Sequence, residues 1–157
     1  MVQLHQRSAD AKTGSLMPTE PSPMDADPPH PARIFKICSV DDWAMATAAG
    51  IYRGSVDDRR DGFIHFSTAA QAGDTARKYF ANRHDLLLIA FAAATLGPQL
   101  RWEPSRGGAL FPHLYAALPT TQALGSCRLL LDATGTPDMA AALQHLTRSG
   151  QLDIASC

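Results

Sequence analysis

One segment near the middle of the chain alternates in side-chain character and predicts a short β-strand. In an extended chain Ile64 and Phe66 point to one face and suit a hydrophobic core. Phe63, His65 and Ser67 then point to the other face. An imidazole and a hydroxyl are therefore expected side by side on the surface, at the end of a strand, which is a common position for a ligand site.

The residues around this strand predict its neighbours. Asp61-Gly62 indicates a turn before it, and Thr68 with Gln71 has the capping-box spacing of a helix start. Further strands are predicted at 33–38, 85–91, 100–103 and 123–131, and apolar character resumes at 109–115. Helices are predicted at 40–49 and after Asp138, ending at Gly150, whereas 52–60 is predicted to be a polar loop.

Strands predominate in this pattern, with two or three helices around them. We therefore expect an α+β fold with a small, split, mostly antiparallel sheet. Residues 1–32 are rich in proline and have no apolar period, which predicts a disordered tail. The folded domain is expected at 33–132, and a C-terminal helix and tail at 133–157. Met17 and Met24 are alternatives to Met1 as the start of translation.

Composition excludes several classes of protein. The 157 residues are 45% apolar and 18% charged, with a net charge of −1, which argues against an extended nucleic-acid surface or a membrane-surface protein. No apolar run approaches the ~20 residues of a membrane span. Three cysteines, without metal-like spacing or a secretory signal, predict free thiols in a reducing compartment, so a cytoplasmic protein is expected.

A second segment with candidate chemistry is 101–108. Ser105 and Arg106 precede Gly107 and Gly108, so backbone N–H groups and a fixed positive charge suit a phosphate or carboxylate, with a plain surface turn as the alternative. Glu103 is either a base or ligand to a sugar hydroxyl, or the partner of a neighbouring arginine.

The aromatic and imidazole residues nearby leave alternatives open. Trp102 either stacks on a planar ring of a ligand or belongs to the core. His113 is either a second imidazole of the site or a buried histidine, and Tyr115 is expected to form a wall. His65, His113 and Glu103 have no short-range spacing typical of a zinc site, so no metal is predicted.

Several blocks of the chain, in the same order, resemble the small bacterial and plant family called domain of unknown function 952. The resemblance covers roughly 34–131, and its blocks are 34–37, Trp43, 50–55, 61–68 and 101–115. It implies a compact fold of the ADP-ribosyltransferase-like superfamily. RNA 2′-phosphotransferase is a similar relative. Ile64-His65-Phe66 resembles a strand of that relative, and Ser105-Arg106-Gly107 a later loop.

The resemblance implies that His65 lies in a dinucleotide cleft whose nicotinamide-ribose side is lined by the segment from Ser105 to Gly108. NAD is then the implied substrate. The sequence departs from the NAD-using relatives in the first strand, where Lys36-Ile37-Cys38 replaces His-Gly-Thr. The glutamate that many transferases of this fold place near the chain end has no clear match, which leaves Glu103 as the candidate.

Three functions follow from these patterns. The first is an NAD-dependent transferase or glycohydrolase in which His65 and Glu103 act on a nucleotide-like small molecule. Ser67, Trp102, His113, Tyr115 and the 105–108 segment would bind that ligand. The second is a binding module of the same fold for a phosphorylated or adenylated ligand, without chemistry. The third is a protein–protein adaptor that uses 111–115 as an apolar patch. The first two require the 65–67 and 103–113 segments to meet.

Overall fold

The computed structural model describes residues 29–149, and the folded unit begins at Pro31. The predicted tail and the three candidate start methionines lie outside the described residues, apart from 29–32. The strands are β1 (Arg33–Ser39), β2 (Ile51–Tyr52), β3 (Ile64–His65), β4 (Leu86–Ala92), β5 (Leu100–Pro104), β6 (Leu110–Leu114), β7 (Leu118–Pro119) and β8 (Ala123–Arg128). The helices are α1 (Val40–Ala49), α2 (Val56–Asp61), α3 (Ala69–Tyr79) and α4 (Met139–Arg148), with short 3-10 helices η1 (Ala93–Gln99), η2 (Arg106–Gly108) and η3 (Thr120–Gln122).

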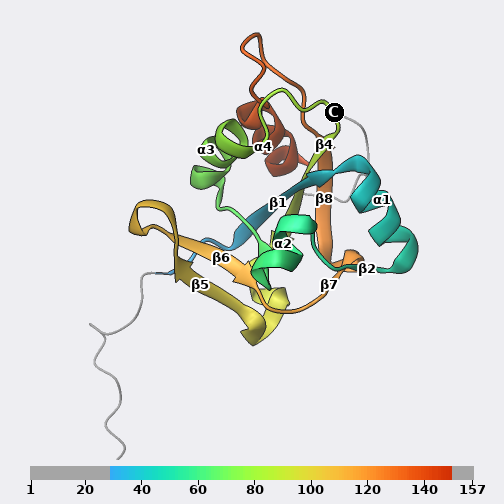
Figure 1. Cartoon of the computed structure of the whole chain (residues 1–157), viewed down its shortest axis with the longest axis vertical. Helices are drawn as coiled ribbons and strands as arrows, with labels where there is room; N and C mark the ends of the chain where they lie inside the picture. The colour runs from blue at the N-terminus through green and yellow to red at the C-terminus, as the bar shows by residue number, and fades with distance from the viewer. Residues whose placement is uncertain (1–28, 150–157) are drawn as a thin grey trace, which may run out of the picture. The chain divides into compact units, whose positions relative to one another are not determined.

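These strands form small antiparallel sheets, as the sequence predicts. The first has the order β1-β4-β8, the second β3-β6-β5, and β2 pairs with β7. Helices α3 and α4 lie together on one side of the first sheet, and the β3-β6-β5 sheet lies on the other (Figure 1). The α+β class and the split antiparallel sheet are therefore confirmed.

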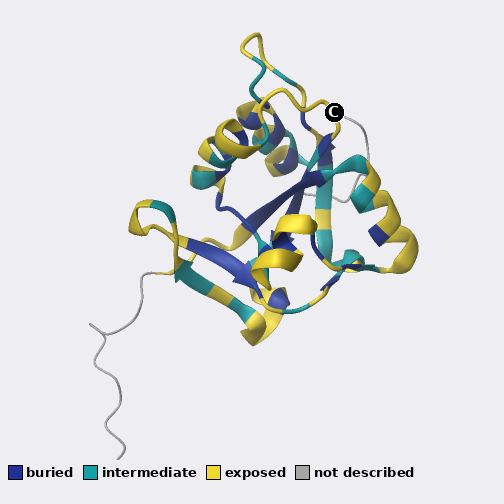
Figure 2. Cartoon of the chain, viewed as in Figure 1, coloured by how far each residue is buried: buried dark blue, intermediate teal, exposed yellow. Residues whose placement is uncertain are grey.

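The first sheet is covered on both faces, and this explains the continuous apolar run in β4. Phe35 and Ile37 of β1 pack toward α3 and α4, whereas Ile34 and Cys38 pack toward the second sheet. Figure 2 shows β1 buried along most of its length. Alternation places Lys36 on the same face as Ile34 and Cys38, so a charged residue points into the layer between the two sheets.

A short bridge connects the two larger sheets. Phe35 and Ser67 exchange both backbone hydrogen bonds, at 2.8 and 2.9 Å, and the Phe66 N–H donates to the Pro112 carbonyl at 3.0 Å. The 66–67 segment, which directly follows β3, is thereby hydrogen-bonded to β1 and to β6.

The polar loop predicted at 52–60 is wrong, because this segment contains the end of β2 and all of α2 except its last residue, Asp61. The Ser55 hydroxyl accepts the Asp58 N–H while the Asp58 carboxylate accepts the Ser55 N–H, which is a reciprocal capping box. The helix has no apolar stripe, since Asp58 is its buried residue. The helix start predicted at Thr68 is observed with its capping box, and Ser39 and Asp138 cap α1 and α4.

Two of the three cysteines lie among the described residues. Cys38 is free and buried, and burial raises the pKa of its thiol to about 12, so it is an unreactive core residue. Cys127 is disulfide-bonded, so the expectation of a free thiol is wrong there. Between residues 29 and 149, no helix combines the length and apolar character that crossing a bilayer would need.

The last helix joins the core of the domain. Met139, Ala142 and Leu146 of α4 are buried in the same cluster as Ala72 and Ala76 of α3. The described part of the segment predicted as a separate C-terminal piece therefore packs against the helix side of the first sheet.

We expect Leu146→Ala to lower the free energy of unfolding by about 2–5 kcal/mol, because the smaller side chain leaves a cavity between α4 and the sheet. Gln144→Ala changes an exposed position of the same helix and serves as the matched control. Urea unfolding followed by tryptophan fluorescence measures both. Equal stability of the two variants would show that α4 does not contribute to the core.

Candidate functional site

The outer face of the β3-β6-β5 sheet gathers most of the polar residues that the sequence singles out. His65 and His113 are direct register partners across β3 and β6, and Arg101 pairs with His113 from β5. The opposite face is apolar, since Ile64, Leu114 and Trp102 pack against the core. We call the outer face of this sheet, with Phe63 and Tyr115 at its strand ends, the imidazole face. Its residues are Phe63, His65, Arg101, Glu103, Phe111, His113 and Tyr115.

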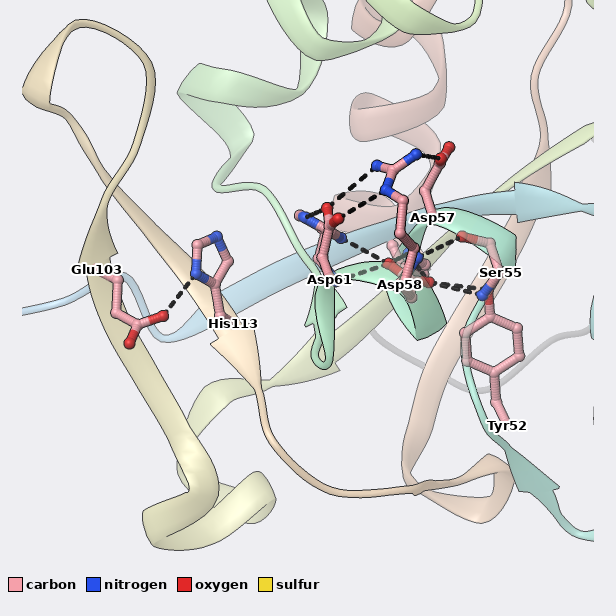
Figure 3. Close-up of polar contacts among 10 residues, drawn as sticks. Tyr52, Ser55, Asp57, Asp58, Asp61, Glu103 and His113 are labelled. Carbon is pink, nitrogen blue, oxygen red and sulfur yellow. Dashed lines mark hydrogen bonds and ion pairs between the residues drawn. The ribbon is translucent and has the colours of Figure 1, made fainter.

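Glu103 is fixed by two partners on the imidazole face. His113 Nδ1 lies 2.8 Å from Glu103 Oε2 (Figure 3). The Tyr115 hydroxyl donates to the same carboxylate at 2.9 Å. The hydrogen bonds from His113 and Tyr115 lower the pKa of Glu103, and the Glu103 carboxylate raises the pKa of Tyr115. Glu103 is therefore an oriented, ionised carboxylate, with its side chain 33% exposed.

The two residues that hold this carboxylate pack against the ring of Phe63. The Phe63 ring stacks on the His113 ring at 4.1 Å between centroids and lies 5.2 Å from the Tyr115 ring. The Arg101 guanidinium lies over the Tyr115 ring, 4.5 Å from its centroid. Because Phe63 covers His113, the imidazole of His113 is only 7% exposed and orients Glu103 more than it faces solvent.

The buried carboxylate of Asp58 contacts His65 of the imidazole face. Asp58 Oδ1 and Oδ2 lie 2.9 and 2.7 Å from Lys36 Nζ, and both side chains are almost fully buried. Asp58 also accepts the N–H groups of Ser55 and His65 and the hydroxyl of Tyr52. Burial alone would raise the pKa of Asp58, but the hydrogen bond from His65 and the charge of Lys36 outweigh it and hold the pKa far below its usual range.

Gly54 lies directly against the side chain of Asp58. Its φ is +95°, and a Cβ built there would lie 2.6 Å from the Cβ of Asp58. Any side chain at this position would both strain the backbone and push α2 away from the sheet. Asp58 is therefore held by its hydrogen bonds and by a turn that only glycine fits.

His65 connects the buried carboxylate to the surface. Its Nδ1 lies 2.7 Å from Asp58 Oδ1, and its Nε2 lies 3.2 Å from Asp61 Oδ2. Asp61 is also held by Arg60. A neutral imidazole donates from one nitrogen only, so both contacts are donations only when the ring is protonated. His65 is 39% exposed, and a ligand on the imidazole face can reach it beside Phe63.

The side chains of Ser67 and Arg106 both contact Thr75 of α3. The Ser67 hydroxyl donates to Thr75 Oγ1 at 3.2 Å, and Arg106 donates to the same oxygen at 3.1 Å. The Arg106 guanidinium also lies over the ring of Phe111, which belongs to the imidazole face. Ser67 is buried, so it positions Thr75 and does not face a ligand.

Backbone N–H groups of the 105–108 segment donate to carbonyl groups of the same turn. The Gly108 N–H donates to the Ser105 carbonyl at 3.0 Å, and the Ser105 N–H donates to the Ala109 carbonyl at 2.9 Å. Gly107 and Gly108 have φ of +65° and +81°, as this tight turn requires. The Ser105 and Gly108 N–H groups therefore close the turn, and Arg106 is the charged, partly exposed side chain of this segment.

The structure thus brings together His65, Glu103, His113 and Tyr115, and places Arg106 beside them. Trp102 lies on the opposite face against the core, which is the structural alternative that the sequence left open. Sequence reasoning missed Lys36 and Asp58. The spacing from Ser55 to Asp58 was the available signal, because it differs from the usual capping box only by an aspartate in place of a glutamate. Among residues 29–149, no group of three or more His, Cys, Asp or Glu residues could hold a metal ion.

The two packed antiparallel sheets with their helices place the chain among small α+β proteins. The chain belongs to the family described as "Protein of unknown function (DUF952)", which matches residues 37–125, and the resemblance to this family is confirmed. The crystal structure of protein CC0527 from Caulobacter crescentus is 44% identical, over 73% of this chain and 98% of that chain, with a TM-score of 0.69.

Two further structures of that protein are similar to this chain. A double mutant in the crystal is 43% identical, over 73% of this chain and 98% of that chain, with a TM-score of 0.69. The solution NMR structure is 44% identical, over 71% of this chain and 96% of that chain, with a TM-score of 0.65. No curated protein matches the chain.

We expect Asp58→Asn to lower the free energy of unfolding near neutral pH by about 3–5 kcal/mol, because Lys36 would remain as an uncompensated buried charge. The folded pKa of Asp58 lies below the unfolded value of about 3.9. The folded state therefore binds fewer protons, and the stabilisation is complete above about pH 5 and declines as the pH falls.

Urea unfolding at a series of pH values between about 6 and 2 measures this effect, and the difference between wild type and Asp58→Asn should narrow toward low pH. Asp57→Asn removes an exposed carboxylate from the same helix and should change stability by no more than about 0.5 kcal/mol. A difference that stays constant over the whole pH range would contradict the ionised, buried state of Asp58.

Proposed function

We propose that the imidazole face binds a nucleotide of the NAD type and that Glu103 assists cleavage of its nicotinamide–ribose bond. The observation that carries this proposal is the ionised Glu103 carboxylate, fixed by His113 and Tyr115 and partly open to solvent. A carboxylate has about four acceptor positions. Hydrogen bonds from His113 and Tyr115 therefore leave room for ribose hydroxyls.

The chemistry follows from the charge that develops during cleavage. The C1′–N bond breaks, its electron pair leaves with the neutral nicotinamide, and the ribose gains oxocarbenium character until water or another acceptor attacks C1′. A fixed carboxylate stabilises that positive charge without reorganising. Glu103 supplies this group, and Phe63 and Tyr115 supply an aromatic wall beside it.

The residues around Glu103 have supporting roles in this proposal. His65, which is open to solvent at the same face, orients a ribose or phosphate oxygen. Arg101 is held over Tyr115 and places a positive charge near the ligand. The split antiparallel sheets agree with the resemblance to the ADP-ribosyltransferase-like superfamily, and the proposal extends that resemblance to NAD.

A second candidate function is binding of the same kind of ligand without chemistry. The observation that favours it is the burial of Lys36, which occupies the first-strand position where the NAD-using relatives have the histidine of His-Gly-Thr. Its ammonium group is buried and forms an ion pair with Asp58 at 2.7 Å, so it does not bind a ligand. Calorimetric titration with NAD and ADP-ribose tests binding in both candidates. Product analysis by chromatography then separates them, because only the enzyme releases nicotinamide.

We expect Glu103→Gln to lower the rate of nicotinamide release by about 100-fold or more and to change the dissociation constant of NAD little, because the amide keeps the shape and loses the charge. Asp85→Asn, in an exposed pair with Arg83, is the control with the same chemical change. Unchanged release in Glu103→Gln would remove this residue from the mechanism. Binding of NAD without nicotinamide release in the wild type would leave the binding module as the function.

A further inference from the structure

Arg106 is held rigidly without a carboxylate partner. Its guanidinium carbon lies 4.7 Å from the ring centroid of Tyr79 and 5.1 Å from that of Phe111, and one nitrogen donates to Thr75. Arg60, Arg77 and Arg83 each form an ion pair with an aspartate. Within residues 29–149 no carboxylate lies within ion-pair distance of Arg106.

This arrangement leaves most of the guanidinium donors for another acceptor. An arginine has five N–H donors in a fixed plane, and the contact with Thr75 uses one of them. The two aromatic rings restrict the plane, so binding an anion would cost little additional side-chain entropy. The side chain is partly exposed, so an anion can reach it from solvent.

A second cation lies at the same aromatic ring. Lys78 Nζ is 5.4 Å from the centroid of Tyr79, and in the described part of the chain it forms no ion pair with a carboxylate. Arg106 and Lys78 both lie over the ring of Tyr79, and among residues 29–149 neither of them forms an ion pair. Two such cations favour an oxygen anion with more than one charge. A phosphate group meets this requirement, and the planar guanidinium matches two of its oxygens.

We infer that Arg106, with Lys78 and the Thr75 hydroxyl, forms a subsite for a phosphate group of the ligand. Phe111 under Arg106 and His113 beside Glu103 are two residues apart on one face of β6, which corresponds to about 7 Å. This spacing suits a ribose at Glu103 and a 5′-phosphate or diphosphate at Arg106. The inference about the ligand rests on the proposed function, whereas the anion site itself can be tested separately.

Three probes distinguish the parts of the ligand in calorimetric or NMR titrations. They are inorganic pyrophosphate, ADP-ribose and nicotinamide riboside, which has no phosphate. Arg106→Gln should weaken pyrophosphate and ADP-ribose about tenfold to hundredfold, the range expected for charged hydrogen bonds. Nicotinamide riboside should bind equally well to wild type and Arg106→Gln. Arg77→Gln removes the same charge from α3 at an exposed position paired with Asp74, and should leave all three affinities unchanged.

Two further variants keep the test decisive. Arg106→Lys keeps the charge and loses the planar donor pair, so it should bind pyrophosphate with an affinity between those of wild type and Arg106→Gln. Lys78→Gln changes an exposed side chain and should weaken pyrophosphate by a smaller factor than Arg106→Gln. Thermal melting of each variant establishes that it is folded before titration.

The outcomes separate this inference from the proposed function. Loss of pyrophosphate binding in Arg106→Gln, together with no nicotinamide release by the wild type, would support the phosphate subsite and reject the enzyme. Nicotinamide release that depends on Glu103, with equal affinity of wild type and Arg106→Gln for pyrophosphate and ADP-ribose, would overturn the subsite and keep the enzyme. Absence of pyrophosphate and ADP-ribose binding in the wild type would also overturn the subsite.

Discussion

The ion pair between Lys36 and Asp58 is the interaction on which the rest of this site depends. Removing two charges from water costs several kcal/mol for each, and the attraction between them offsets this only when the remaining donors and acceptors are satisfied. Asp58 meets that condition, since it accepts hydrogen bonds from Ser55, Tyr52 and His65 as well as from Lys36. Four separate elements, β1, β2, α2 and β3, are thereby connected at one carboxylate.

The position of the imidazole face follows from this connection. Strand β3 has only two residues, and so short a strand fixes its own register weakly. Asp58 accepts both the backbone N–H and the ring nitrogen of His65, which fixes that residue opposite His113. A slip of one residue would turn His65 inward and Ile64 outward, so the buried carboxylate determines which side chains the surface presents.

Part of this site could be predicted from the sequence because several local signals agree. In the 61–68 segment, the alternation, the Asp-Gly turn and the capping residue all indicate the same strand and the same exposed histidine. The pairing of Glu103 with His113 could not be predicted, since it depends on the register of β5 on β6. Trp102 was ambiguous for a related reason: alternation separates two faces but does not tell which one the core covers.

The buried charges were harder to predict still. Lys36 and Asp58 are 22 residues apart, and each is buried only because the other is present. A hydropathy pattern assigns both residues to the surface, so it predicts a loop at 52–60 where the structure has α2. Partners of this kind are visible only when the tertiary structure is known.

The two hydrogen bonds between Phe35 and Ser67 have a consequence for association between chains. Strand β1 lies at the edge of its sheet, and an unpaired edge is where a strand of another molecule can add and begin aggregation. Ser67 occupies the middle of that edge from the same chain. Growth of the sheet by an incoming strand would first require the 66–67 segment to separate from β1, so the segment that follows the exposed histidine also protects the protein against intermolecular strand addition.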